Sequence, residues 1–122
     1  MSELKGKIDF VALISATEAN PNGDPLNGNR PRENFDGFGE ISDVCIKRKI
    51  RNRWQDMGQK IFVQSDDRSY DTYSSLKERA DGYTPLQEEI KKGKKAGRDK
   101  CAQLACQEWL DVRSFGQGFA FK

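Results

Sequence analysis

The chain has 122 residues and a net charge of +2, with 35% hydrophobic and 33% charged residues and no histidine. This length fits about one domain, and the small net charge excludes a protein that is basic throughout, so a nucleic-acid role must depend on where the charges lie. The lack of histidine excludes Ser-His and Cys-His catalysis within the chain. Three cysteines without a CxxC pair favour neither disulfides nor zinc and are typical of the reducing cytoplasm. Residues 1–7 are polar and show no signal-peptide pattern, and the longest apolar run, Val11–Ile14, is too short to span a membrane.

The first predicted element is a strand from Lys7 to Ala16. Apolar residues occupy both of its faces, which is typical of a strand inside a sheet. The stretch Asn20–Gly39 follows and is rich in glycine, proline and asparagine, which favour turns. A loop near twenty residues is unusual inside a domain, and we expect it to be functional or disordered.

The clearest predicted helix runs from Ser42 to Met57. Ser42 is a suitable N-cap, and Gly58 is a suitable terminator. One apolar stripe recurs at helical spacing, and the other faces carry five cations without an acid among them. The stripe consists of Ile46, Ile50, Trp54 and Met57, and the cations are Lys47, Arg48, Lys49, Arg51 and Arg53.

The second half of the chain is less regular. A short strand is predicted at Lys60–Gln64. Residues Ser65–Lys100 are interpreted as a charged, partly mobile insertion. Within it, Thr84 is expected to cap a helix that has Pro85 at its first position. Core-like spacing returns in a helix from Cys101. A loop and an alternating strand containing Phe119 and Phe121 then end the chain, and a chain that stops inside a strand is expected to be part of a longer protein.

Two features suggest contact with a polyanion. Five cations in seven residues repel one another in the folded helix but become favourable against phosphates through counterion release. The upstream loop adds Arg30 and Arg32, together with glycine backbone that can form an anion-binding nest. The alternatives are a solvated helix face and an ordinary surface loop whose asparagines cap turns, and the pattern leaves both open.

The segment Arg113–Gly116 combines a cation, a hydroxyl, the Phe115 ring and a flexible joint. A ring beside an arginine suits stacking on an unpaired base, although Phe115 can equally be a core residue. The acidic residues show no paired spacing, so we expect no catalytic residue, no metal site and no cofactor.

Three stretches in this order resemble a known family. They are "EANPNGDPLNGNRPR" (Glu18–Arg32), "ISDVCIKRKIRNR" (Ile41–Arg53) and "WLDVRSFGQ" (Trp109–Gln117). Together they resemble the backbone subunit of the type I-C CRISPR Cascade effector. The resemblance covers most of residues 7–63 and 100–122 but only the N-terminal part of such a subunit.

The resemblance implies an α+β fold, an RNA-recognition-motif-like (ferredoxin-like) palm with insertions, which is incomplete in this chain. Residues 1–64 would supply the first strand, the loop, the basic helix and the second strand of the palm. Residues 65–100 would be a finger-like insertion, and residues 101–122 a second helix, a loop and the start of the next palm strand.

The resemblance also implies a non-catalytic role in antiviral defence. Copies of the subunit would polymerise along CRISPR RNA, contact other Cascade subunits and present the guide for pairing with target DNA, without a membrane. The implied RNA-binding residues are Asn20, Asn22, Arg30, Arg32, Lys47, Arg48, Arg51, Arg113, Ser114, Phe115 and Gly116. The alternatives are a CRISPR RNA-processing endoribonuclease of related fold and an interaction module whose basic helix meets an acidic protein.

Overall fold

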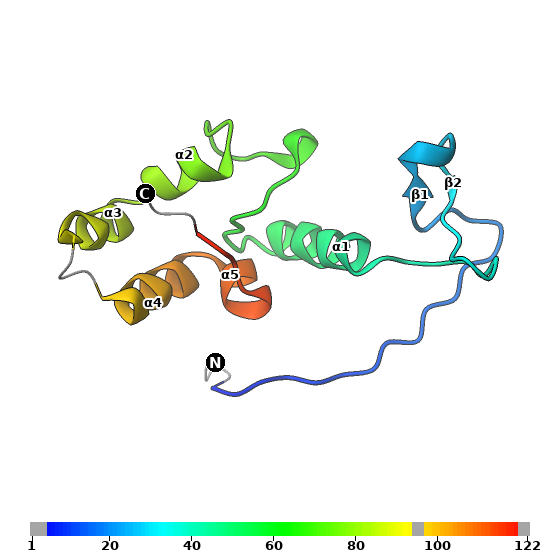
Figure 1. Cartoon of the computed structure of the whole chain (residues 1–122), viewed down its shortest axis with the longest axis horizontal. Helices are drawn as coiled ribbons and strands as arrows, with labels where there is room; N and C mark the ends of the chain where they lie inside the picture. The colour runs from blue at the N-terminus through cyan, green and yellow to red at the C-terminus, as the bar shows by residue number, and fades with distance from the viewer. Residues whose placement is uncertain (1–4, 94–96, 120–122) are drawn as a thin grey trace. The chain divides into compact units, whose positions relative to one another are not determined.

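The computed structural model describes residues 5–93 and 97–119. It divides into two compact units, Met1–Ser42 and Asp43–Lys122, and each is described by itself (Figure 1). Helices and one two-stranded antiparallel sheet make up the regular structure of the described residues. This content is compatible with the predicted α+β class.

The glycine- and proline-rich loop folds into a small hairpin in the first unit. Strand β1 (Gly23–Asp24) pairs antiparallel with strand β2 (Arg30–Pro31), and the 3₁₀ helix η1 (Pro25–Asn27) joins them. The Asp24 carboxylate caps η1 by accepting from the Leu26 N–H at 3.0 Å. Gly28 then takes a φ of 60°, the left-handed conformation that glycine adopts without strain.

A second turn follows at Asn34. Its side-chain oxygen accepts from the N–H groups of Asp36 and Phe38, each at 3.0 Å, and an isolated bridge joins Glu33 to Gly39. The turn leaves the rings of Phe35 and Phe38 exposed. The long loop is therefore two successive, internally bonded turns.

The predicted strand Lys7–Ala16 is not a strand in this structure. The segment is irregular, and its large apolar side chains, including Phe10 and Leu13, are exposed. A strand needs a neighbour to take its backbone hydrogen bonds, and the short pair β1–β2 is the only sheet in the described residues. Pairing of this segment stays a prediction for a longer protein.

The predicted strand Lys60–Gln64 is also irregular, although Ile61 and Phe62 are fully buried. Side chains take the place of a neighbouring strand, because the Tyr70 hydroxyl accepts from the Ile61 N–H at 2.9 Å and the Asp111 carboxylate accepts from the Phe62 N–H at 2.7 Å. The apolar pattern correctly marked burial and wrongly implied a ladder.

The predicted basic helix is confirmed as α1 (Asp43–Asp56). Its C-terminus has the hydrogen bonds of a Schellman motif: the Gln59 N–H donates to the Trp54 carbonyl and the Gly58 N–H donates to the Gln55 carbonyl, each at 2.9 Å. Gly58 has a φ of 76°, as this motif requires.

The core of the second unit lies among four further helices. They are α2 (Leu76–Asp81), α3 (Thr84–Lys91), α4 (Arg98–Glu108) and α5 (Leu110–Phe115), with the 3₁₀ helix η2 (Asp66–Arg68) before them (Figure 1). Their buried cluster is made of Phe62, Ala80, Leu86, Cys101, Ala105, Trp109 and Val112. The spacing of apolar residues from Cys101 onward therefore predicted core positions correctly.

The structure corrects two details of this half and leaves one open. Ala80 and Leu86 of the segment Ser65–Lys100 lie in the core, and its finger-like, partly mobile character stays a prediction. Helix α3 begins one residue earlier than predicted, with Tyr83 at the N-cap, so Thr84 does not cap it. Residues predicted as a loop after Leu110 form α5, while Phe121 lies outside the described residues.

Candidate nucleic-acid interface

The two predicted loop asparagines hold the first unit together. The Asn20 amide donates to the Asn29 carbonyl at 2.8 Å. The Asn22 side-chain oxygen accepts from both the N–H and the hydroxyl of Ser42 at 2.9 Å. Their polar groups thus close the loop on itself, and this role was not visible in the sequence.

The two loop arginines differ in their surroundings. Arg32 forms an ion pair with Glu40 at 2.9 Å, and hydrogen bonding to that carboxylate raises the pKa of Arg32. Arg30 is exposed and makes no ion pair within the described residues. Across residues 20–40 these two cations are outnumbered by four carboxylates, which are Asp24, Glu33, Asp36 and Glu40. The loop therefore carries a net negative charge and is a weak polyanion site except around Arg30.

Two of the predicted phosphate contacts on α1 are bonded inside the second unit. The Arg48 guanidinium donates to the Val63 carbonyl oxygen, and burial, followed by the nearby Arg51 charge, lowers the pKa of Arg48. Arg51 Nε donates to Asp111 Oδ2 at 2.8 Å in an ion pair whose side chains are 13% and 0% exposed. Both arginines attach α1 to the core.

Asp111 is the centre of this attachment. Besides Arg51, its carboxylate accepts from the backbone N–H groups of Phe62 and Val63, at 2.7 and 3.1 Å. A buried carboxylate is tolerated only when paired and hydrogen-bonded, and these three donors satisfy that condition. Asp111 was not among the residues singled out from the sequence, because its partners lie far away along the chain.

The predicted stacking residue Phe115 already has aromatic and cationic neighbours. Its ring stacks on Trp54 with centroids 5.3 Å apart and planes inclined by 28°. The Arg51 guanidinium lies 5.1 Å and the Lys47 ammonium 5.8 Å from the centre of the same ring. These distances suit cation–π contacts, so Phe115 attaches α5 to α1.

The remaining predicted residues lie at the exposed surface. Lys47 is half-exposed and forms an i,i+4 pair with Asp43 at 3.1 Å. Arg113 and Ser114 on α5 are exposed, and Gly116 ends that helix with a φ of 77°. The structure therefore brings Lys47 to Phe115, while RNA contact by Arg113, Ser114 and Gly116 stays a prediction.

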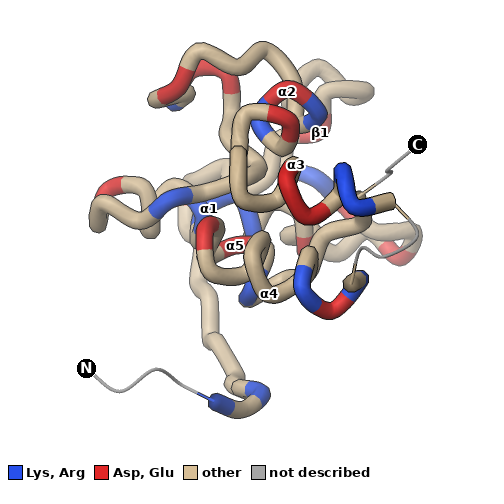
Figure 2. Tube along the Cα trace, turned by 90° about the vertical axis from the view of Figure 1, so that its left-hand side faces the viewer, with Lys and Arg blue, Asp and Glu red and all other residues tan. Residues whose placement is uncertain are grey.

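Lys49 and Arg53 are the cations of α1 that the site prediction left out. Both are exposed, and neither makes an ion pair or hydrogen bond within the part of the chain that the structure describes. The nearest acid at helical spacing from Arg53 is Asp56, whose carboxylate instead binds Arg68. Figure 2 marks the Lys and Arg residues in blue, among them residues of α1. Their i,i+4 spacing is visible in the sequence, but Lys47 and Arg51 have the same spacing, so the sequence did not distinguish Lys49 and Arg53.

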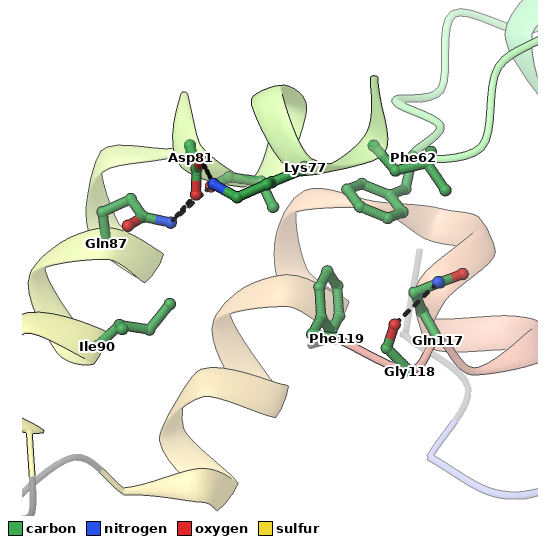
Figure 3. A pocket seen from close by; sticks show the side chains of 10 residues that line it. Phe62, Lys77, Asp81, Gln87, Ile90, Gln117, Gly118 and Phe119 are labelled. Carbon is green, nitrogen blue, oxygen red and sulfur yellow. Dashed lines mark hydrogen bonds and ion pairs between the residues drawn. The ribbon is translucent and has the colours of Figure 1, made fainter. Parts of the chain in front are cut away.

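An apolar pocket of about 550 Å³ lies elsewhere in the second unit. The rings of Phe62 and Phe119 and the Ile90 side chain line it, as Figure 3 shows. At its edge Lys77 pairs with Asp81 at 2.5 Å, and Gln87 donates to the same carboxylate at 3.2 Å. The charged groups of the edge are thus occupied with one another.

The described residues show no sign of a metal centre, a membrane span or a disulfide. No three potential metal ligands gather among the described side chains, and no helix there has the length and apolarity needed to cross a membrane. The three cysteines form no disulfide.

The comparisons with known proteins agree on one family. A family model described as CRISPR-associated protein Cas7 matches residues 6–122. A CRISPR-associated protein Cas7 from Haloferax volcanii is 31% identical over 116 residues, which are 93% of this chain and 32% of that protein. The chain thus spans about a third of the length of this curated relative. No solved structure matches. The chain belongs to the Cas7 family of CRISPR-associated proteins.

Proposed function

We propose that this chain is the guide-binding N-terminal part of a non-catalytic Cascade backbone subunit of type I-C. Copies of the subunit line one CRISPR RNA, contact the other Cascade subunits and present the guide to target DNA. Membership of the Cas7 family over residues 6–122 is the observation that carries the proposal.

The charge distribution on α1 supports backbone binding. Lys49 and Arg53 carry positive charges that no carboxylate of the described residues neutralises. A guide that must pair with DNA needs its base edges left accessible, so the protein must hold the sugar–phosphate chain without reading sequence. Exposed cations on a rigid helix do this, and their affinity for RNA decreases as salt rises.

The palm remains part of the proposal. In the longer protein, the segment Lys7–Ala16 would pair with further strands, because its two apolar faces are exposed here and need a sheet to bury them. The predicted loop contacts reduce to Arg30, since Asn20, Asn22 and Arg32 have partners within their own unit. The cysteines, which form no disulfide in the described residues, fit the reducing cytoplasm as the place of assembly.

Binding of a labelled single-stranded RNA of about 20 nucleotides, the length of a guide–target duplex, tests the proposal. Two unrelated sequences should bind with similar affinity, and both affinities should fall between about 50 and 200 mM salt. Lack of binding, or binding to only one sequence, would contradict it.

The same mixtures separate the alternatives. An endoribonuclease of related fold would shorten the RNA during incubation, whereas the proposed subunit leaves it intact on a denaturing gel. An interaction module for an acidic protein would leave the RNA unbound at low salt.

A further inference from the structure

The five cations of α1 differ in their contacts. Arg48 and Arg51 are bonded to groups that belong to the core of the second unit, namely the Val63 carbonyl and the Asp111 carboxylate. Lys49 and Arg53 are exposed and have no hydrogen bond or ion pair within the described residues. Lys47 is intermediate, since it is half-exposed and paired with Asp43.

Arg51 is poorly placed to meet a phosphate. Its guanidinium lies over the Phe115 ring, its side chain is 13% exposed, and Nε is bonded to Asp111. Moving it outward to RNA would leave the Asp111 carboxylate buried without its cation, which is unfavourable. A phosphate contact by Arg51 would therefore weaken the attachment of the helix that carries it.

Lys49 and Arg53 have the opposite properties. They are one turn apart on the same face of α1, and four residues of helix rise about 6 Å. Like charges at this spacing destabilise a helix slightly, and no carboxylate of the described residues relieves the repulsion, because Asp56 is bonded to Arg68. Nothing in the fold of the second unit uses these two charges.

We propose that Lys49 and Arg53 form the phosphodiester-binding site of α1, and that Arg51 serves only to attach the helix to Asp111. The inference rests on the proposed RNA-binding function and assigns it to different residues from those that the sequence pattern favoured. The ligand class is a single-stranded polyphosphate backbone, bound without base readout.

The decisive variant is the double substitution K49Q/R53Q in the full chain. Glutamine has nearly the helix propensity of lysine and arginine, so the exposed helix should remain folded. Each lost phosphate contact lowers the salt slope by about 0.7 for a single strand. If two contacts are lost, the decrease in RNA affinity between about 50 and 200 mM salt becomes about sevenfold smaller than in the unchanged chain.

Two further variants are measured beside it with the same labelled RNA. K91Q/K100Q removes the same net charge from two exposed lysines on α3 and α4 and should keep the slope of the unchanged chain. R51M should lower the midpoint of thermal unfolding while, at temperatures where it is folded, its salt slope stays unchanged.

Each outcome has one meaning. An equal loss of slope in K49Q/R53Q and K91Q/K100Q would show that only total charge matters and would overturn the inference. An unchanged slope in K49Q/R53Q, or a flattened slope in R51M, would also overturn it while leaving RNA binding by the chain intact. Absence of binding by the unchanged chain would overturn the proposed function as well.

Discussion

The buried ion pair between Arg51 and Asp111 gives the sharpest prediction for stability. The substitutions are D111A, R51M and the two combined. Asp111 Oδ1 and Oδ2 together accept three hydrogen bonds, from Arg51 and from the N–H groups of Phe62 and Val63. Arg51 has Asp111 as its sole hydrogen-bonded carboxylate in the described residues. The two single substitutions should therefore have unequal effects.

The magnitudes follow from what each substitution leaves behind. D111A leaves a mostly buried guanidinium and a buried Phe62 N–H without acceptors. Together these two losses should lower the free energy of unfolding by about 5 kcal/mol, which is near the upper limit for a broken buried pair. R51M leaves the carboxylate with its two backbone donors and the nearby charge of Arg48, so about 2 kcal/mol is expected. The combined variant should lose less stability than D111A, because it no longer leaves the guanidinium buried without an acceptor, although the Phe62 N–H still lacks one.

Urea unfolding followed by tryptophan fluorescence measures these differences, since Trp54 and Trp109 lie in the affected unit. E88Q, at an exposed carboxylate of α3, is the matched control and should change stability by less than about 0.5 kcal/mol. Equal losses from D111A and R51M, or a loss below about 1 kcal/mol in D111A, would refute the view that Asp111 holds α1 to the core.

Three further outcomes are expected. Hydrogen bonding to Arg79 lowers the pKa of Asp71, so the folded state binds this proton less readily than the unfolded state. Stability should therefore fall as the pH decreases from about 3.9 through the lower folded pKa. In urea unfolding at several acidic pH values, D71N should show a weaker acid-induced loss of stability than the unchanged chain, and at neutral pH it should be less stable. G58A should destabilise the chain by about 1 kcal/mol in the same assay, because its φ of 76° is unfavourable for alanine. F35A/F38A should leave RNA affinity unchanged in a salt titration, since these exposed rings lie in a loop with excess negative charge.

The elements predicted best from the sequence are those specified locally. Helix α1 was predicted with its ends nearly correct, because its apolar stripe at helical spacing and its terminating Gly58 lie within or directly beside the helix. The core positions from Cys101 to Val112 followed from the same spacing. Interruption of the helix at Trp109 was not predictable from this pattern, because α5 continues the apolar period after a break in the backbone.

The strands were predicted less well, for a physical reason. An alternating or two-sided apolar pattern reports burial, whereas a strand also requires partners for its N–H and C=O groups. At Phe62 the partner is a carboxylate, and no ladder forms. At Lys7–Ala16 the apolar side chains remain exposed in this structure.

The cations show a different limit of sequence reasoning. A run of charges identifies a basic helix but does not tell which charges have partners, and the partner of Arg51 is 60 residues away. Phe115 and Trp54 are 61 residues apart in sequence and stacked in space. Two of the stretches that carry the family resemblance, Ile41–Arg53 and Trp109–Gln117, are thus joined by an ion pair and by the stacking of Phe115 on the helix that the first stretch begins. The attachment of α1 to α5 then explains part of the sequence that these two stretches have in common with the family. A residue's place in these motifs therefore does not by itself indicate contact with RNA.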